Sequence, residues 1–287
     1  MKILIGLILL CLSYSYPPQL FAQQIKIDVG VILSSDVKTR FNKSTETTSC
    51  LDIKDYVYKG STRVYAEALL TCQALTIGGI DPIFKFHEYP NYGRALKELK
   101  KGSIHLLFST VWLNQKNENL YVSQPLMHSG DFEKGIYTLE DNNALLKVTN
   151  VEQLKGFSAI SNKEFLVDWQ ILSKLEIDIY SNPNWERLFK MLKAKRGDFI
   201  LAEFSPEPDM SIITSGVKLI PVPMIKVTFN QSRHLFVNKH KENSEIIFEG
   251  LQSGLKILQA QGTIKKAYQS LGFYNEKTSH WLSLCCQ

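Results

Sequence analysis

The side chains that could bind a small molecule fall mainly at the ends of expected strands. Ser109 and Thr110 close an apolar run at 105–111, and Trp112 follows it directly. Arg94 lies near the start of an expected helix, just beyond the carboxyl end of another expected strand. Open α/β sheets bind ligands at the carboxyl ends of their strands. We therefore predict Arg94 as an anion clamp, Trp112 as a stacking platform, and the two hydroxyls as ligand contacts. The alternatives are a salt bridge for Arg94, on the surface or between lobes, and a packed position for Trp112.

Two further polar residues, Arg233 and His234, lie in a short segment late in the chain. That segment is expected to return to the first half of the fold. The two side chains could face a ligand or order the connection, and we predict ligand contact for Arg233.

Catalytic patterns are weak in this sequence. Ser35 and Lys38, and again Ser215 and Lys218, have the Ser-x-x-Lys spacing, but the partner motifs of that enzyme class do not occur. The six histidines are scattered without the spacing of metal ligands. We therefore predict no catalytic residue, no metal site and no cofactor.

The elements that must position these residues follow a regular alternation. Apolar periodicity predicts strands at 25–32, 82–89 and 105–111, with helices at 61–77 and 90–102 between them. After residue 142 the alternation repeats. The later strands are expected at 157–160, 177–180, 199–202 and 217–222, and the later helices at 163–175, 183–197 and from 244 onward.

The stretch 120–142 indicates a crossover from one lobe to a second, and 231–240 indicates the return. We predict an α/β fold of two lobes, each a mixed sheet flanked by helices, joined by two crossing strands. Lobe one is expected at 23–133 and 239–287, and lobe two at 134–238. A cleft between two such lobes is a common place for a small ligand.

The first 22 residues are typical of a secretory signal peptide, because Lys2 precedes an apolar run and cleavage is expected near Ala22. The net charge is +5 for the chain of 287 residues, and +4 once Lys2 is removed. So small a charge does not indicate a nucleic-acid binder. We expect an exported, periplasmic, monomeric protein.

The four cysteines beyond the leader have three pairings open to them in an oxidising compartment. We favour a disulfide between Cys50 and Cys72, which would attach the polar loop 34–58 to the following helix. Cys285 and Cys286 are adjacent, so we expect them to be free or linked elsewhere. The alternative is that no cysteine pairs.

The chain resembles the type II periplasmic solute-binding proteins, in the branch that includes amino-acid-binding proteins. The resemblance extends over nearly the whole chain beyond the leader. It rests on four short motifs in the family's order. They are Leu96-Lys-Glu-Leu-Lys-Lys-Gly-Ser-Ile-His105, Tyr121-Val-Ser-Gln-Pro125, Leu154-Lys-Gly156 and Gly197-Asp-Phe-Ile-Leu-Ala-Glu203.

The resemblance implies further ligand contacts. The family's carboxylate-binding arginine is matched by Lys116, nine positions before Pro125. The acid that binds a ligand ammonium is matched by Glu203. Ser161 and Asn162 stand where the family begins a helix whose amides bind an anion.

This resemblance implies periplasmic binding of a small polar solute, anionic or zwitterionic and amino-acid-like, for transport or sensing. The partner would be an ABC permease or a sensor in the inner membrane. The alternative is an enzyme on the same scaffold, similar to the family's dehydratases, with Glu203 as general acid.

Overall fold

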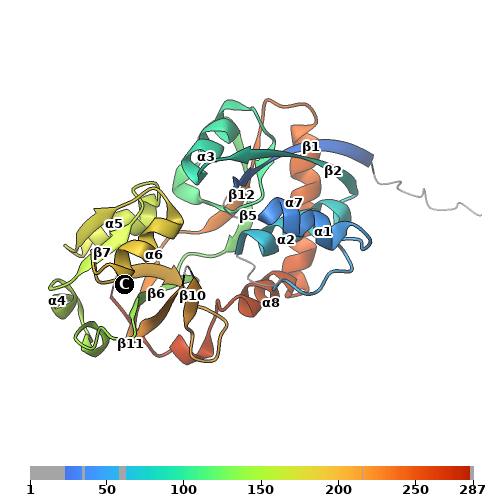
Figure 1. Cartoon of the computed structure of the whole chain (residues 1–287). Helices are drawn as coiled ribbons and strands as arrows, with labels where there is room; N and C mark the ends of the chain where they lie inside the picture. Colours follow the sequence, from blue (N-terminus) through green and yellow to red (C-terminus); the bar gives the residue numbers. More distant parts are fainter. Residues whose placement is uncertain (1–22, 34–35, 58–62, 215, 285–287) are drawn as a thin grey trace, which may run out of the picture.

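The computed structural model describes residues 23–33, 36–57, 63–214 and 216–284 (Figure 1). The expected signal peptide and the pair Cys285 and Cys286 lie outside the described residues. No helix in the described part of the chain is long and apolar enough to cross a membrane.

Lobe one is built on a six-stranded sheet in the order β2-β1-β3-β12-β4, with β5 also paired to β12. Strand β1 is parallel to both β2 and β3, as the alternation of strands and helices predicts. Its strands are β1 (Gln23–Ile32), β2 (Ile80–Tyr89), β3 (Leu106–Leu107), β4 (Val111–Trp112), β5 (Leu120–Met127) and β12 (Arg233–Asn238). Its helices are α1 (Val37–Thr45), α2 (Arg63–Ile77), α3 (Tyr92–Lys101), α7 (Ser244–Ala260) and α8 (Thr263–Ser270), with the 3₁₀ turn η2 (Leu113–Gln115).

Lobe two contains a five-stranded sheet in the order β10-β11-β6-β9, with β13 paired to β11, and a parallel pair β7-β8. Its strands are β6 (Phe132–Leu139), β7 (Ser158–Ser161), β8 (Asp178–Ser181), β9 (Ile200–Glu203), β10 (Ile212–Thr214), β11 (Val217–Phe229) and β13 (Leu282–Ser283). Its helices are α4 (Val151–Leu154), α5 (Leu166–Lys174) and α6 (Trp185–Lys193), with the 3₁₀ turns η3 (Leu145–Lys147) and η4 (Glu276–Thr278).

The chain crosses between the sheets where β5 leads into β6 and where β11 leads into β12 (Figure 1). Strand pairing corrects two details of the expected boundaries. Strand β12 belongs to the first sheet although 134–238 was expected to form lobe two. Strand β13 hydrogen-bonds to the second sheet although 239–287 was expected to form lobe one. Elsewhere the expected division stays a prediction.

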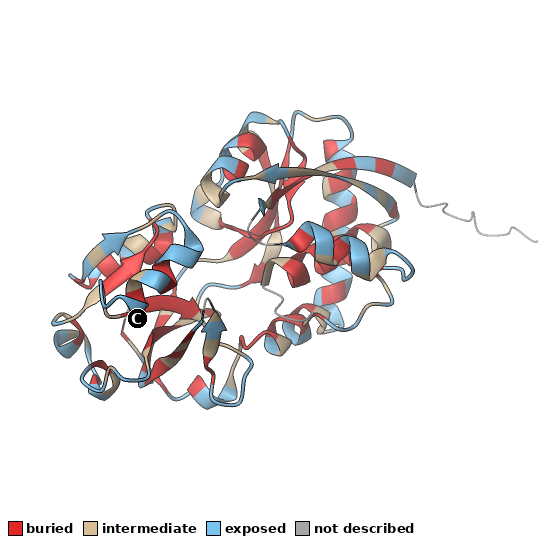
Figure 2. Ribbon diagram, viewed as in Figure 1, coloured by how far each residue is buried: buried red, intermediate tan, exposed pale blue. Residues whose placement is uncertain are grey.

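Helix α7 approaches α2 closely because small residues line the contact. A Cβ added at Gly254 would lie 1.8 Å from the carbonyl oxygen of Ala74, and the carbonyl of Gly250 would meet a Cβ at Gly78 at 1.9 Å. Only glycine permits this approach. One cluster of buried apolar residues includes members of both lobes, and buried segments lie inside each lobe in Figure 2.

Cys50 and Cys72 form a disulfide with a Cα–Cα distance of 6.3 Å. This confirms the favoured pairing. The bond attaches the loop after α1 to the middle of α2, where Gln73 also donates to the carbonyls of Cys50 and Ile53.

Candidate site at the interlobe contact

The contact between the lobes is made by an ion pair that the sequence did not single out. Arg63 is the first residue of α2 in lobe one, and Glu203 is the last residue of β9 in lobe two. Nε of Arg63 lies 2.9 Å from Oε1 of Glu203. The side chain of Glu203 is 31% exposed and that of Arg63 is 14% exposed, so the pair borders solvent on the lobe-two side.

Behind this pair lies Glu67, a fully buried carboxylate one helical turn after Arg63. Nη1 of Arg63 lies 2.7 Å from each of its oxygens. Thr110 donates its backbone N–H at 2.8 Å and its hydroxyl at 2.6 Å, and the phenol of Tyr268 donates at 2.9 Å. A buried carboxylate is stable only when donors and cations surround it in this way.

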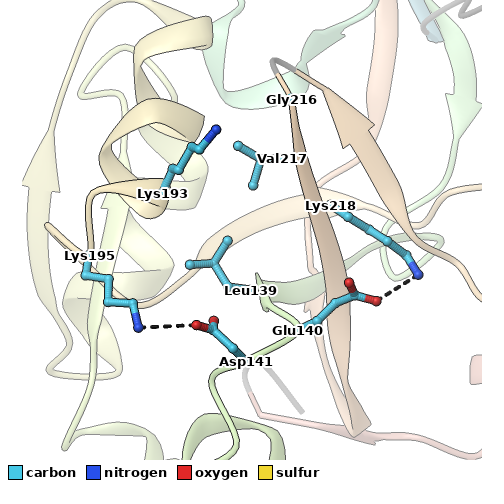
Figure 3. Close-up of a pocket in the computed structure, with 8 residues that line it drawn as sticks. All are labelled: Leu139, Glu140, Asp141, Lys193, Lys195, Gly216, Val217 and Lys218. Carbon is cyan, nitrogen blue, oxygen red and sulfur yellow. Dashed lines mark hydrogen bonds and ion pairs between the residues drawn. The ribbon is translucent and has the colours of Figure 1, made fainter.

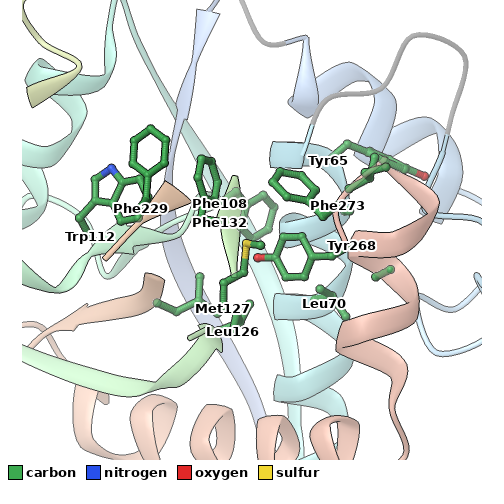
Figure 4. Packing of buried hydrophobic residues seen from close by; sticks show 14 of the residues in the cluster. Tyr65, Leu70, Phe108, Trp112, Leu126, Met127, Phe132, Phe229, Tyr268 and Phe273 are labelled. Atoms are coloured by element: carbon green, nitrogen blue, oxygen red, sulfur yellow. The ribbon is translucent and has the colours of Figure 1, made fainter. Parts of the chain in front are cut away.

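A second buried guanidinium completes the network from the return strand. Arg233 on β12 donates from Nε to the hydroxyl of Thr110 at 2.7 Å and from Nη2 to its carbonyl at 2.6 Å. Its guanidinium carbon lies 4.3 Å above the ring of Trp112. That ring stacks on Phe229 at 5.5 Å and meets Phe132 edge-on at 5.0 Å, and the three rings are drawn in Figure 4. The guanidinium of Arg233 therefore lies against an aromatic cluster.

The pKa shifts indicate that Arg63 and Arg233 both interact with the single carboxylate of Glu67. Burial opposes charge on Arg63, yet Glu67 and Glu203 beside it raise its pKa. Burial alone would raise the pKa of Glu67, but Arg63 and Arg233 outweigh burial and hold that pKa below its ordinary value of 4.5. Burial lowers the pKa of Arg233, and Arg63 lowers it further. Lobe one therefore has an excess of positive charge here, and the acid that balances it comes from lobe two.

Lobe two contributes a second ion pair close to the crossing. Nζ of Lys134 lies 2.5 Å from Oδ1 of Asp168. The same ammonium lies 5.9 Å from the ring centroid of Phe132 and 5.6 Å from that of Phe229. The interlobe network is the set of charges around the Phe132 ring, with Arg63, Arg233 and Glu67 from lobe one and Lys134, Asp168 and Glu203 from lobe two. Two cations and one anion give lobe one a charge of +1, and one cation and two anions give lobe two a charge of −1.

Two polar atoms at the interlobe contact are buried without a hydrogen-bond partner among the described residues. One is the phenol oxygen of Tyr92, the first residue of α3, and the other is Oε2 of Glu164 in lobe two. The Glu164 carboxyl carbon lies only 3.4 Å from a Cβ built at Gly93, so this side chain reaches α3 across the lobes. Buried polar atoms without partners are rare and call for an explanation.

Three of the predicted site residues meet in this network, namely Thr110, Arg233 and Glu203. Ser109 is buried beside them, and its hydroxyl donates to the carbonyl of Thr110 at 3.3 Å. Trp112 is 9% exposed and occupies the packed position that was its alternative interpretation.

The other predicted residues lie apart from the ion pair. Arg94 is 52% exposed at its side chain and lies 2.9 Å from Glu98 of its own helix, which is the salt bridge given as its alternative. Lys116 is exposed just after a 3₁₀ turn. Ser161 and Asn162 are buried at the end of β7, where the Asn162 side chain accepts the N–H of Glu164 at 2.9 Å.

A separate pocket of about 350 Å³ lies on lobe two (Figure 3). Two of the three lysines that line it are paired with acids. Lys195 lies 3.2 Å from Asp141, and Lys218 lies 2.8 Å from Glu140. The pocket has no contact with the interlobe network, so it is not the candidate site.

No protein-family model matches the sequence, and no curated protein matches it. Solved structures match the fold. An ancestral arginine-binding protein bound to arginine is 16% identical, with a TM-score of 0.52 over 86% of this chain and 97% of that one. The probable amino-acid ABC transporter extracellular-binding protein ytmK from Bacillus subtilis is 16% identical, with a TM-score of 0.55 over 88% and 99%. The periplasmic VFT2 domain of BvgS from Bordetella pertussis is 11% identical, with a TM-score of 0.54 over 86% and 92%. The chain thus has the two-lobed type II periplasmic-binding-protein fold that its motifs predict.

Proposed function

We propose that this protein binds a small zwitterionic, amino-acid-like solute between its lobes, for transport or sensing outside the cytoplasm. The observation that carries the proposal is the ion pair between Arg63 and Glu203. Each partner lies at the edge where its lobe's parallel strands end, which is where such folds bind ligands.

The charge balance selects the kind of solute. A ligand that enters this contact must separate Arg63 from Glu203. A simple anion would leave Glu203 without its cation, and a simple cation would leave Arg63 without its acid. Leaving either charge without its partner at this partly buried contact is unfavourable. A zwitterion replaces both partners at once, with its carboxylate on Arg63 and its ammonium on Glu203.

Closure follows from the same arrangement. With the lobes apart, the surplus of +1 on lobe one and −1 on lobe two faces water. A zwitterion bound to both surfaces favours the closed state over the open one, because it contacts both lobes only when they are closed. A permease or a sensor domain would recognise that closed state, and the similar folds named above include a transporter's binding protein and a periplasmic domain.

The proposal is tested by thermal-shift screening of the purified protein, without its leader, against a metabolite library, followed by calorimetry. A true ligand at 100 times its Kd stabilises the folded state by about 2.7 kcal/mol. Arg63→Gln and Glu203→Gln should each weaken binding by at least about tenfold. Glu207→Gln, an exposed residue on the same lobe as Glu203, should leave binding unchanged. Unaltered affinity in Glu203→Gln would overturn the proposal.

Recovery of the ligand after incubation distinguishes a binding protein from the alternative, an enzyme on the same scaffold. We expect the molecule to be extracted unchanged after prolonged incubation with the protein, as mass spectrometry would show. A ligand consumed at a rate that Glu203→Gln abolishes would establish the dehydratase-like reading instead.

A further inference from the structure

Glu164 lies outside the charge balance of the interlobe network. The six charges of that network cancel, with three cations against three carboxylates. Among the described residues, no Lys, Arg or His nitrogen forms a salt bridge with Glu164, and its Oε2 has no hydrogen-bond partner. The interlobe contact therefore carries one surplus negative charge.

The topology places this surplus charge beside Glu203. Strand β7 adjoins β9 through a parallel bridge between Ala159 and Phe199, and the N–H of Ile160 donates to the carbonyl of Phe199 at 2.8 Å. Glu203 ends β9, and Glu164 follows the end of β7 by three residues. Both carboxylates consequently lie at the same edge of lobe two.

Lobe one faces Glu164 with the start of α3. Gly93 has no side chain, which leaves room for the carboxylate, and Tyr92 beside it has a buried, unpartnered phenol oxygen. Burial raises the pKa of the Tyr92 phenol, so it stays a neutral donor and acceptor. A buried carboxylate oxygen without a partner is a suitable acceptor for a ligand cation that carries several N–H donors.

We infer that Glu164 is a specificity-determining residue, and that the solute carries a second positive group which Glu164 receives. This rests on the proposed function, in which the first ammonium and the carboxylate engage Glu203 and Arg63. The ligand class is a basic amino acid, of net charge +1, which cancels the surplus negative charge. A site with a buried polar group of this kind discriminates strongly against an analogue that lacks the partner.

Two matched pairs of probes test the inference. L-arginine and L-citrulline differ in the charge of the distal group, and L-lysine and L-norleucine differ in its presence. We expect the basic member of at least one pair to bind at least about tenfold more tightly by calorimetry. In Glu164→Gln that ratio should fall to within about twofold, while binding of the neutral member is retained. Glu207→Gln should keep the full ratio.

The outcomes separate this inference from the proposed function. If a neutral or acidic amino acid binds and both basic probes bind no better than their analogues, the inference fails and the proposed function stands. The inference also fails if Glu164→Gln, folded as judged by its unchanged circular dichroism, keeps the wild-type preference. If no zwitterion binds, the proposed function and the inference fail together.

Discussion

Removal of the buried charge of Glu67 should destabilise the protein strongly. Glu67→Gln keeps the size of the side chain but replaces one carboxylate oxygen with an NH₂ group. That group would face donors from Arg63, Thr110 and Tyr268 that now converge on the carboxylate. Two buried guanidinium groups would remain in lobe one without an acid of their own lobe.

The expected magnitude follows from the burial of the pair. The Glu67 side chain is 0% exposed and that of its ion-pair partner Arg63 is 14% exposed. Breaking a buried ion pair by removing one partner costs about 3–5 kcal/mol. For a chain of this size that loss corresponds to a fall in Tm of roughly 6–20 °C.

The assay is urea unfolding followed by circular dichroism, with Glu207→Gln as the charge-matched control on the surface. Combining Glu67→Gln with Arg233→Met removes one cation with the acid and should recover part of the loss, by about 0.5–3 kcal/mol. A loss below about 1 kcal/mol in Glu67→Gln would refute the view of this network as a buried, mutually dependent unit.

The same residue gives the stability a defined dependence on pH. The pKa of Glu67 is lower in the folded chain than its ordinary value of 4.5. Its contribution is therefore fully present above about pH 4.5 and is lost as the pH falls through the folded pKa. The difference in stability between wild type and Glu67→Gln should shrink on acidification. A difference that grows would contradict the assignment.

Three further predictions concern the framework. Replacing both Cys50 and Cys72 by serine should lower the free energy of unfolding by about 3 kcal/mol, and a reductant should then have no further effect. Gly254→Ala should cost about 1–3 kcal/mol because its Cβ would overlap a carbonyl of α2, whereas Gly156→Ala, with 3.6 Å of clearance, should be nearly neutral in the same urea titration. Burial opposes the charge of Asp28, but hydrogen bonds from a histidine and a lysine lower its pKa to about 2. The free energy of unfolding of the wild type should therefore exceed that of Asp28→Asn by about 1–2 kcal/mol near neutral pH. This difference should disappear as the pH falls from about 4 to about 2.

The order of strands and helices was predictable because burial imposes simple periods. The expected helix at 61–77 is observed as Arg63–Ile77, and the strand at 82–89 as Ile80–Tyr89. Among the predicted site residues, Thr110 and Arg233 share a hydrogen bond, and Glu203 lies next to them through Arg63, while their role in binding stays a prediction. The sequence order of these residues did not indicate which side chains would become their hydrogen-bond or ion-pair partners.

Sequence spacing alone could not predict which arginine forms the ion pair with Glu203. Arg63 and Arg94 each lie in the first turn of a helix, and each is followed four positions later by a glutamate, Glu67 or Glu98. The two pairs differ in burial. Helix α2 is buried from Tyr65 to Leu75, whereas α3 turns Arg94 to solvent. The informative signal was Glu67 itself, the single acid of helix α2 and the only charged residue on its buried stretch from Tyr65 to Leu75, because a charge on a buried face must have a partner.

The last strand adds a constraint on the motion that binding would use. Beyond the crossings at 128–131 and 230–232, the chain leaves α8 in lobe one and pairs with β11 in lobe two through β13. The N–H of Leu284 donates to the carbonyl of Lys226 at 2.8 Å, and Nζ of Lys226 donates to the carbonyl of Thr278 at 2.8 Å. Opening must therefore bend the chain at three places or detach β13. Hinge motions bend the chain at only a few positions. If β13 stays paired, the lobes can therefore separate only as far as the segment between α8 and β13 can stretch. Under the proposed function, the separation of Arg63 from Glu203 by a small molecule would need only a small movement of this kind.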